Sequence, residues 1–317
     1  MNKNTTSSPG FLLSANLVFF LLAPFGQAQD FTYSTNNGTI AITGYTGPGG
    51  AVTIPDVING LPVTAIGDAV FKQKFNVTTI TLPSNITSIG NWAFAYTAIT
   101  DLVIPNTVTN LGDYAAYSCY SLLRIVVPGS VGNIGLLAFS DCTHLGSIVL
   151  LDGVSSIGTN AFADDNFGSV IIPATVTNLA YEAFGGCYSL KSLYFKGDAP
   201  YADPYAFYGT PRPVTAYYPP GANGWGPTLG VDPPMQTGIW RPLQALTHDG
   251  NFGVQNNRFS FTVAGSTNDV VVVDACTNLA NPVWSYVSVL TLSGGSSLFS
   301  DARWTNYPGR FYRVRSL

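Results

Sequence analysis

The chain has 317 residues, of which 46% are hydrophobic and only 9% are charged, and its formal net charge is -4. Apolar residues are abundant and recur at regular intervals, which excludes a disordered chain. Lys and Arg show no surplus except near the C-terminus, which argues against a nucleic-acid-binding face. Low charge with many Thr, Ser, Asn, Gly and aromatic residues is typical of an exported, β-rich protein.

Residues 1–28 are predicted to be a signal peptide. Lys3 gives a weakly positive start, residues 11–25 are apolar, and the small residues Gly26 and Ala28 place the cleavage site after Ala28. The alternative is an uncleaved membrane anchor, although the apolar stretch is shorter than the ~20 residues that a span needs. No later segment is long enough to cross a membrane. We therefore expect a secreted or cell-surface protein with no transmembrane span after removal of the signal.

Residues 29–53 are predicted to form a cap at the N-terminal end of the fold. The segment from Phe31 to Tyr45 has alternating apolar residues after the turn Asn36-Asn37-Gly38, a pattern that indicates a hairpin. A terminal coil of a repeat array has one uncovered apolar face, and this hairpin is placed to cover it.

Residues 54–220 contain a repeat of about 22–23 residues that reads I-x-I-P-x-x-V-x-x-I-G-x-x-A-F-x-x-C-x-x-L-x-x. A small residue recurs seven positions after the end of each first strand: Gly90, Gly112, Gly135, Gly158 and Ala180. Four positions further on stand Phe94, Ala116, Phe139, Phe162 and Phe184. A fixed period of this length with apolar ladders predicts a solenoid, in which each repeat is one coil.

Each repeat is predicted to contain two short strands and one turn. The phenylalanines should fill the core between coils, and Tyr114 or Tyr117 should fill the gap that Ala116 leaves. Alternation along the first strand directs its outer residues inward and its middle residue outward. These middle residues are Thr81, Val103, Val126, Val149, Ile171 and Tyr194.

Three of the four cysteines stand seven positions after the small residue of their repeat: Cys119, Cys142 and Cys187. We expect buried thiols in one column, while a disulfide between Cys119 and Cys142 in neighbouring coils is the alternative. Lys74, Thr97 and Asp165 share the column, which offers no histidine and no Cys-x-x-Cys pair. A metal site is therefore not expected.

The repeat fades after residue 220. Residues 221–251 are rich in Gly and Pro and are predicted to be a linker. Residues 252–317 are predicted to form a small β module, with strands over residues 258–264, 269–275, 284–292 and 310–315. The last strand carries Arg310, Arg313 and Arg315, a candidate sorting or anchoring tail, the alternative being a solvated strand face.

The segment Leu82-Pro83-Ser84-Asn85-Ile86-Thr87-Ser88-Ile89-Gly90-Asn91-Trp92-Ala93-Phe94 resembles the BspA-type leucine-rich repeats of bacterial surface proteins. The resemblance covers roughly residues 44–220, and the motif is specific. It implies a mainly β leucine-rich repeat solenoid of short strands and short helical or 3-10 turns, followed here by the small C-terminal β domain. It also implies binding or adhesion, with no fixed ligand.

The residues for catalysis are few. The two histidines, His144 and His248, stand in unrelated contexts, and Glu182 is the single glutamate. No nucleophile motif, phosphate loop or facing pair of carboxylates is present. Asp141, Asp164 and Asp165 are expected in solvated turns, with weak Ca²⁺ binding as the alternative. We therefore predict no catalytic, cofactor or metal residues.

The sequence favours a binding surface instead. The candidate face consists of Thr81, Val103, Arg124, Val126, Val149, Ile171 and Tyr194. Contiguous exposed apolar strips are unusual, although a β-branched ladder that merely suits a sheet is the alternative. We predict an exported, non-catalytic protein that recognises an unidentified protein or glycan at the cell surface. The alternatives are a structural envelope spacer without a soluble ligand and, less favoured, an exoenzyme.

Overall fold

The computed structural model describes residues 30–240, 242–265, 269–280, 282–307 and 309–316. The predicted signal peptide lies outside these residues. In the described part of the chain, no helix is long and apolar enough to cross a membrane.

A hairpin begins the fold. Strands β1 (Phe31–Asn36) and β2 (Thr39–Tyr45) pair antiparallel through a turn at Asn37 and Gly38, both with positive φ. Phe31 and Tyr45 are buried, and the Tyr45 ring centroid lies 5.2 Å from that of Phe71 in the first coil. The predicted hairpin is confirmed, and its aromatic residues cover the core of the first coil.

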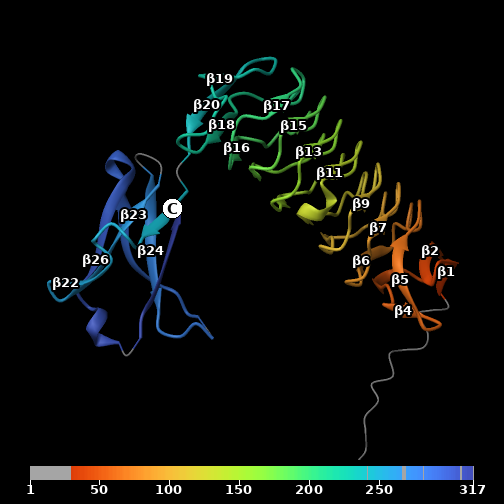
Figure 1. Ribbon diagram of the computed structural model, residues 1–317, viewed down its shortest axis with the longest axis horizontal. Coiled ribbons are helices and arrows are strands. Elements are labelled where there is room, and N and C mark those ends of the chain that lie inside the picture. The colour runs from red at the N-terminus through yellow and green to blue at the C-terminus, as the bar shows by residue number, and fades with distance from the viewer. Residues whose placement is uncertain (1–29, 241, 266–268, 281, 308, 317) are drawn as a thin grey trace, which may run out of the picture.

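The repeats form stacked coils, which follow one another in an arc (Figure 1). The first strands of the coils pair in parallel, in the groups β3–β6, β8–β10–β12 and β14–β16–β18–β20. Their bounds are β3 (Gly50–Thr53), β6 (Val77–Thr81), β8 (Asp101–Val103), β10 (Arg124–Val127), β12 (Ser147–Leu150), β14 (Ser169–Ile172), β16 (Ser192–Phe195), β18 (Thr215–Tyr218) and β20 (Met235–Ile239).

The second strands of the coils form another parallel set, in the groups β2–β5–β7–β9 and β11–β13–β15–β17. Their bounds are β5 (Leu61–Ile66), β7 (Ser88–Ile89), β9 (Asn110–Leu111), β11 (Asn133–Ile134), β13 (Ser156–Ile157), β15 (Asn178–Leu179) and β17 (Tyr201–Ala202). The short strand β4 (Val57–Ile58) pairs antiparallel with β5, and a 3-10 turn, η2 (Gly129–Val131), follows β10.

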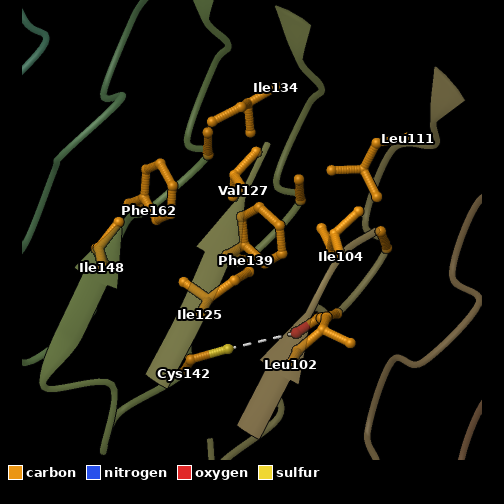
Figure 2. Packing of buried hydrophobic residues seen from close by; sticks show 14 of the residues in the cluster. Leu102, Ile104, Leu111, Ile125, Val127, Ile134, Phe139, Cys142, Ile148 and Phe162 are labelled. Carbon is orange, nitrogen blue, oxygen red and sulfur yellow. Dashed lines mark hydrogen bonds between the residues drawn. The ribbon is translucent and has the colours of Figure 1, made fainter. Parts of the chain in front are cut away.

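The turn segments between these strands carry the core phenylalanines. Successive hydrogen bonds, such as Thr97 N–H to the carbonyl of Phe94, close the turns. The rings of Phe139 and Phe162 stack at 5.4 Å, and those of Phe162 and Phe184 at 5.6 Å. Figure 2 shows Phe139 and Phe162 among the inward residues of neighbouring strands, including Ile125 and Val127.

The cysteine column consists of buried free thiols, as predicted. Each sulfur donates a hydrogen bond to a carbonyl of the preceding coil: Cys119 to Phe94 at 3.1 Å, Cys142 to Ala116 at 3.3 Å, and Cys187 to Phe162 at 3.1 Å. Thr210 makes the same bond to Phe184 at 2.8 Å. In the coils that carry Cys119, Cys142, Cys187 and Thr210, the column therefore satisfies one buried carbonyl of the preceding coil, which explains the small donor side chains at these positions.

The prediction that Tyr114 or Tyr117 fills the place of Ala116 is wrong. Both tyrosines are half-buried and lie at the outer edge of the turns, where Tyr114 stacks on Trp92 with a centroid distance of 4.0 Å. Tyr114 has φ +58°, as Trp92 has φ +59° two residues after the preceding small-residue position. This shared backbone conformation directs the rings of Trp92 and Tyr114 along the edge of the turns. There the hydroxyl of Tyr114 stays near water.

The predicted linker also needs correction, because repeat-like pairing continues into it. β20 pairs in parallel with β18, and β19 (Thr228–Leu229) folds back antiparallel on β20. Trp225 packs on the core, 4.9 Å from the ring of Phe195, and donates its indole N–H to the carbonyl of Gly197. The solenoid therefore extends to Ile239. Strand pairing and the packing of Trp225 hold this segment in place although its many Gly and Pro residues disfavour regular structure.

The remaining strands form two antiparallel sheets, β21–β23–β22 with β26 on the other side of β23, and β25–β24–β27. Their bounds are β21 (Gln244–Leu246), β22 (Gly253–Gln255), β23 (Arg258–Ala264), β24 (Val270–Cys276), β25 (Ser285–Thr291), β26 (Ser296–Asp301) and β27 (Phe311–Ser316), with 3-10 turns η3 (Ser293–Gly295) and η4 (Trp304–Asn306). Phe261, Val273 and Phe299 belong to a core of their own. The sequence missed β21, β22 and β26. In β26 Phe299 is the only apolar side chain that turns inward, so the apolar pattern is weak there.

Candidate recognition surface

The outward residues of the first strands form one stripe over neighbouring coils. Val103 pairs with Val126 and Val126 with Val149, and Ile171 pairs with Tyr194. The exposed fractions of Val103, Val149 and Ile171 are 54%, 38% and 45%, whereas Val126 and Tyr194 are half-buried. Neighbouring strands of a sheet lie about 4.8 Å apart, so these side chains are direct neighbours. The predicted alternation and its outward apolar row are therefore present.

The stripe continues beyond the residues that the sequence identified. Tyr194 pairs with Tyr217, and their rings stack at 5.2 Å with an interplanar angle of 13°. The Trp240 ring lies 5.2 Å from that of Tyr194. Sequence reasoning missed Trp240 because it assigned this segment to a linker. The preceding segment Met235–Ile239 contains a glycine and only two β-branched residues, so its strand signal is weak.

The two polar members of the predicted face lie differently. Thr81 ends β6, is exposed, and pairs with Thr53 of β3. Arg124 begins β10 beside the stripe, and its Nε donates to a carboxylate oxygen of Asp101 at 3.1 Å. Both partners of this ion pair are about half exposed, so it adds little stability. Its effect on the surface is to balance the Arg124 charge beside the apolar residues.

A second aromatic group lies along the outer edge of the turns. Trp92 stacks on Tyr114, while Tyr96 and Tyr117 meet edge to face at 5.6 Å. The ammonium group of Lys72 lies 3.8 Å from the centroid of Trp92. The contacts of Trp92 with Lys72 and Tyr114 engage its ring within the fold. This group therefore offers fewer free ring faces to a ligand than its size suggests.

The three aspartates of the neighbouring turns, Asp141, Asp164 and Asp165, are not arranged as the ligands of one metal ion. Asp141 accepts hydrogen bonds from the hydroxyls of Ser118 and Tyr120 at 2.9 and 3.1 Å. Asp164 is exposed, and partial burial together with Asp141 and Glu182 raises its pKa. Among the described residues, no group of three His, Cys, Asp or Glu side chains is placed to hold a metal ion.

Asp165 was expected in a solvated turn, and this expectation is wrong. Its side chain is buried in the cysteine column, where one carboxyl oxygen accepts the N–H of Cys142 at 2.8 Å and the other has no hydrogen-bond partner. Burial raises the pKa of the Asp165 carboxyl well above its ordinary value, and burial likewise raises the pKa of the Cys142 and Cys187 thiols. A raised thiol pKa leaves little thiolate at neutral pH, so these cysteines are poor nucleophiles.

The other residues with catalytic potential are held in local contacts. Glu182 accepts a hydrogen bond from the side-chain amide of Asn160 at 2.7 Å. A ring nitrogen of His144 lies 2.6 Å from the carbonyl of Tyr120, and one of His248 lies 2.8 Å from the hydroxyl of Thr247. These histidines are attached to separate turns rather than to a shared site.

Arg313 and Arg315 of β27, and Arg310 just before this strand, are paired inside their own module. Arg313 and Arg315 both contact Asp274, at 3.0 and 2.9 Å, and Arg310 contacts Asp301 at 3.2 Å. The hydrogen bond from Arg315, supported by that from Arg313, lowers the pKa of Asp274. A sorting or anchoring role for this tail stays a prediction, and an anionic partner would have to compete with Asp274 for Arg313 and Arg315.

Comparison with known proteins agrees with the repeat architecture. Six copies of the BspA type leucine-rich repeat region match residues 64–191 and 156–219. No curated protein matches the chain.

Several solved structures are similar to the chain. A leucine-rich repeat protein from Bacteroides ovatus is 19% identical, with 60% of this chain and 70% of that chain covered and a TM-score of 0.32. The T. pallidum leucine-rich repeat protein is 22% identical, with 51% and 89% covered and a TM-score of 0.32. A leucine-rich cell surface protein from Faecalibacterium prausnitzii is 19% identical, with 61% and 88% covered and a TM-score of 0.26. On the repeat motif, the stacked coils and the family match, residues 64–219 of the chain are a BspA-type leucine-rich repeat region.

Proposed function

We propose that the chain is an exported, non-catalytic recognition protein that binds a protein or glycan partner through the stripe. The observation that carries this proposal is the outward apolar row itself, which is paired in register from Val103 to Val149 and again from Ile171 through Tyr194 to Tyr217. A sheet that served only as a spacer would gain nothing from exposing aliphatic side chains to water, since polar β-branched residues suit a sheet equally well.

The chemistry of the stripe favours a protein partner over a glycan. The centres of protein interfaces are depleted of charge and enriched in aromatic residues. The stripe combines aliphatic residues with the aromatic group Tyr194, Tyr217 and Trp240 at one end, and Arg124 beside it is balanced by Asp101. Aliphatic side chains offer no hydrogen bonds to sugar hydroxyls, so the aromatic end is the part that suits a sugar ring.

The test is a binding screen of the purified full chain against arrays of extracellular proteins and of glycans. The variant Val103→Asp, Val149→Asp places two carboxylates in the stripe at exposed positions, where the fold should tolerate them. We expect at least a ~10-fold loss of affinity for any saturable partner, because burial of an unpaired charge at an interface is unfavourable. Circular dichroism and thermal melting check that the variant stays folded.

The matched control is Val57→Asp, the same substitution at a comparably exposed valine of β4 outside the stripe. It should leave binding unchanged. Absence of saturable binding on both arrays would favour the spacer role, and binding that survives the double substitution would move recognition to another face.

A further inference from the structure

The C-terminal module contains a hollow that strands of both of its sheets line. Strand β21 and the β22–β23 hairpin line it on one side, β27 on another, and the segment between β24 and β25 contributes Leu279 and Trp284. Its volume is about 490 Å³, within the range of small-molecule sites in proteins. Neither the repeat array nor the stripe is part of this hollow.

The lining of the hollow is mainly aromatic. Phe259 stacks on Tyr312 with ring centroids 5.3 Å apart and an interplanar angle of 7°, and both belong to the wall. Phe252 is 5.7 Å from Phe259 and is about half exposed at the opening. Such a lining offers flat apolar contacts to a ring or a short alkyl chain.

One cation stands in this lining. The side chain of Arg310 is 9% exposed, its Nε contacts Asp301 at 3.2 Å, and its guanidinium lies 4.3 Å from the ring centroid of Tyr307. A terminal nitrogen, Nη1, is buried without a hydrogen-bond partner. Buried guanidinium N–H groups are normally paired, so this atom is an unsatisfied hydrogen-bond donor.

Arg310 also lines a smaller hollow of about 280 Å³, together with Cys276, Val283 and Tyr307. Arg310 is therefore part of the wall of both hollows. The larger aromatic hollow can hold the apolar part of a ligand, and because Nη1 is buried, a movement of the side chain at the wall brings it to the ligand.

We propose that this module binds a small organic acid, with its carboxylate on Arg310 and its apolar or aromatic body in the larger hollow. A carboxylate is favoured over a neutral acceptor because a charge-assisted hydrogen bond to guanidinium is the stronger one. Asp301 already contacts Nε, so the ligand completes the hydrogen bonding of the guanidinium at Nη1 rather than replacing Asp301. The proposal is independent of partner binding by the stripe.

The test is titration of the full chain at pH 7 with 3-phenylpropionate and, separately, with its neutral amide, followed by calorimetry and ligand-observed NMR. We expect saturable binding of the acid below ~1 mM and at least ~10-fold weaker binding of the amide. Arg310→Gln should reduce binding of the acid to the level of the amide.

Arg310→Gln also removes the contact with Asp301, so a second variant guards against loss of folding. Leu279→Asp adds a carboxylate at an exposed wall position and should weaken the acid ~10-fold by repulsion, while Leu298→Asp, equally exposed on β26 outside the lining, should not. No saturable binding of the acid up to ~10 mM, equal binding of acid and amide, or equal losses in the two leucine variants would each overturn the proposal.

Discussion

Asp165 occupies the position that cysteine holds in three other repeats, and it fits that position poorly. The cysteines and Thr210 each donate to a buried carbonyl of the preceding coil. A carboxylate has no hydrogen to donate, and one oxygen of Asp165 is left without a partner. The raised pKa of Asp165 is the physical result, because the protonated form avoids a buried charge.

This residue makes stability depend on pH in a definite direction. An acid whose pKa is higher in the folded state binds more protons there, so stability is greatest below the unfolded pKa and falls as the pH rises from about 4 through the folded value. We expect Asp165→Asn to raise the free energy of unfolding at pH 8 by roughly 1–3 kcal/mol, because the amide keeps the acceptor for Cys142 and carries no charge. Urea denaturation at pH 4 and pH 8 measures the effect.

The control for this prediction is Asp56→Asn, at an exposed aspartate, which should change stability little at either pH. If the wild-type protein gained stability between pH 4 and pH 8 relative to Asp165→Asn, the raised pKa of the buried Asp165 would be contradicted.

At the scale of elements, the recurring glycine is explained by how closely the coils approach at one corner. A Cβ atom on Gly112 would lie 2.4 Å from the backbone nitrogen of Asn91 and 2.5 Å from the carbonyl carbon of Gly90, both in the preceding coil. Gly112 itself donates its N–H to Ile89 at 2.8 Å, which fixes this approach. The glycine that recurs in the repeat is thus required by the close packing of successive coils.

Gly112→Ala should therefore destabilise the solenoid by about 1–3 kcal/mol, the usual cost of forcing extra volume into a packed region. Gly146→Ala is the matched control, since its nearest neighbouring atom would be 3.9 Å from the new Cβ. Equilibrium urea unfolding of both variants checks the difference. Equal stability of the two variants would contradict this packing requirement at Gly112.

At the scale of the whole molecule, the described residues divide into two separate apolar cores. One extends from Phe31 to Met235, and the other is built around Phe261, Val273 and Phe299. Asp274 joins β24 to β27 through Arg313 and Arg315 within the second core region. Separate cores should unfold separately, which would support the predicted domain division.

We expect calorimetry of the full chain to show two transitions. Asp274→Asn should lower the midpoint temperature of the transition of the C-terminal module by more than about 5 °C, since it weakens charge-assisted hydrogen bonds worth about 2 kcal/mol. Phe162→Ala, which removes a fully buried ring, should lower the midpoint temperature of the transition of the solenoid. Because the folded pKa of Asp274 is lowered, its contribution is present above the ordinary pKa and is lost as the pH falls below about 4. A single transition shifted by both variants would contradict independent cores.

The sequence by itself determined the features that repeat. The period and the Gly–Phe spacing predicted stacked coils, and alternation predicted that Val103, Val149 and Ile171 face outward, because inward and outward positions follow from local strand geometry. Tertiary structure alone decided that Asp165 is buried, that Tyr114 lies outside the core, that β20 extends the solenoid, and that Arg310 meets Asp301. These outcomes depend on contacts that join different strands, turns or coils. A periodic sequence pattern does not specify which residues make such contacts.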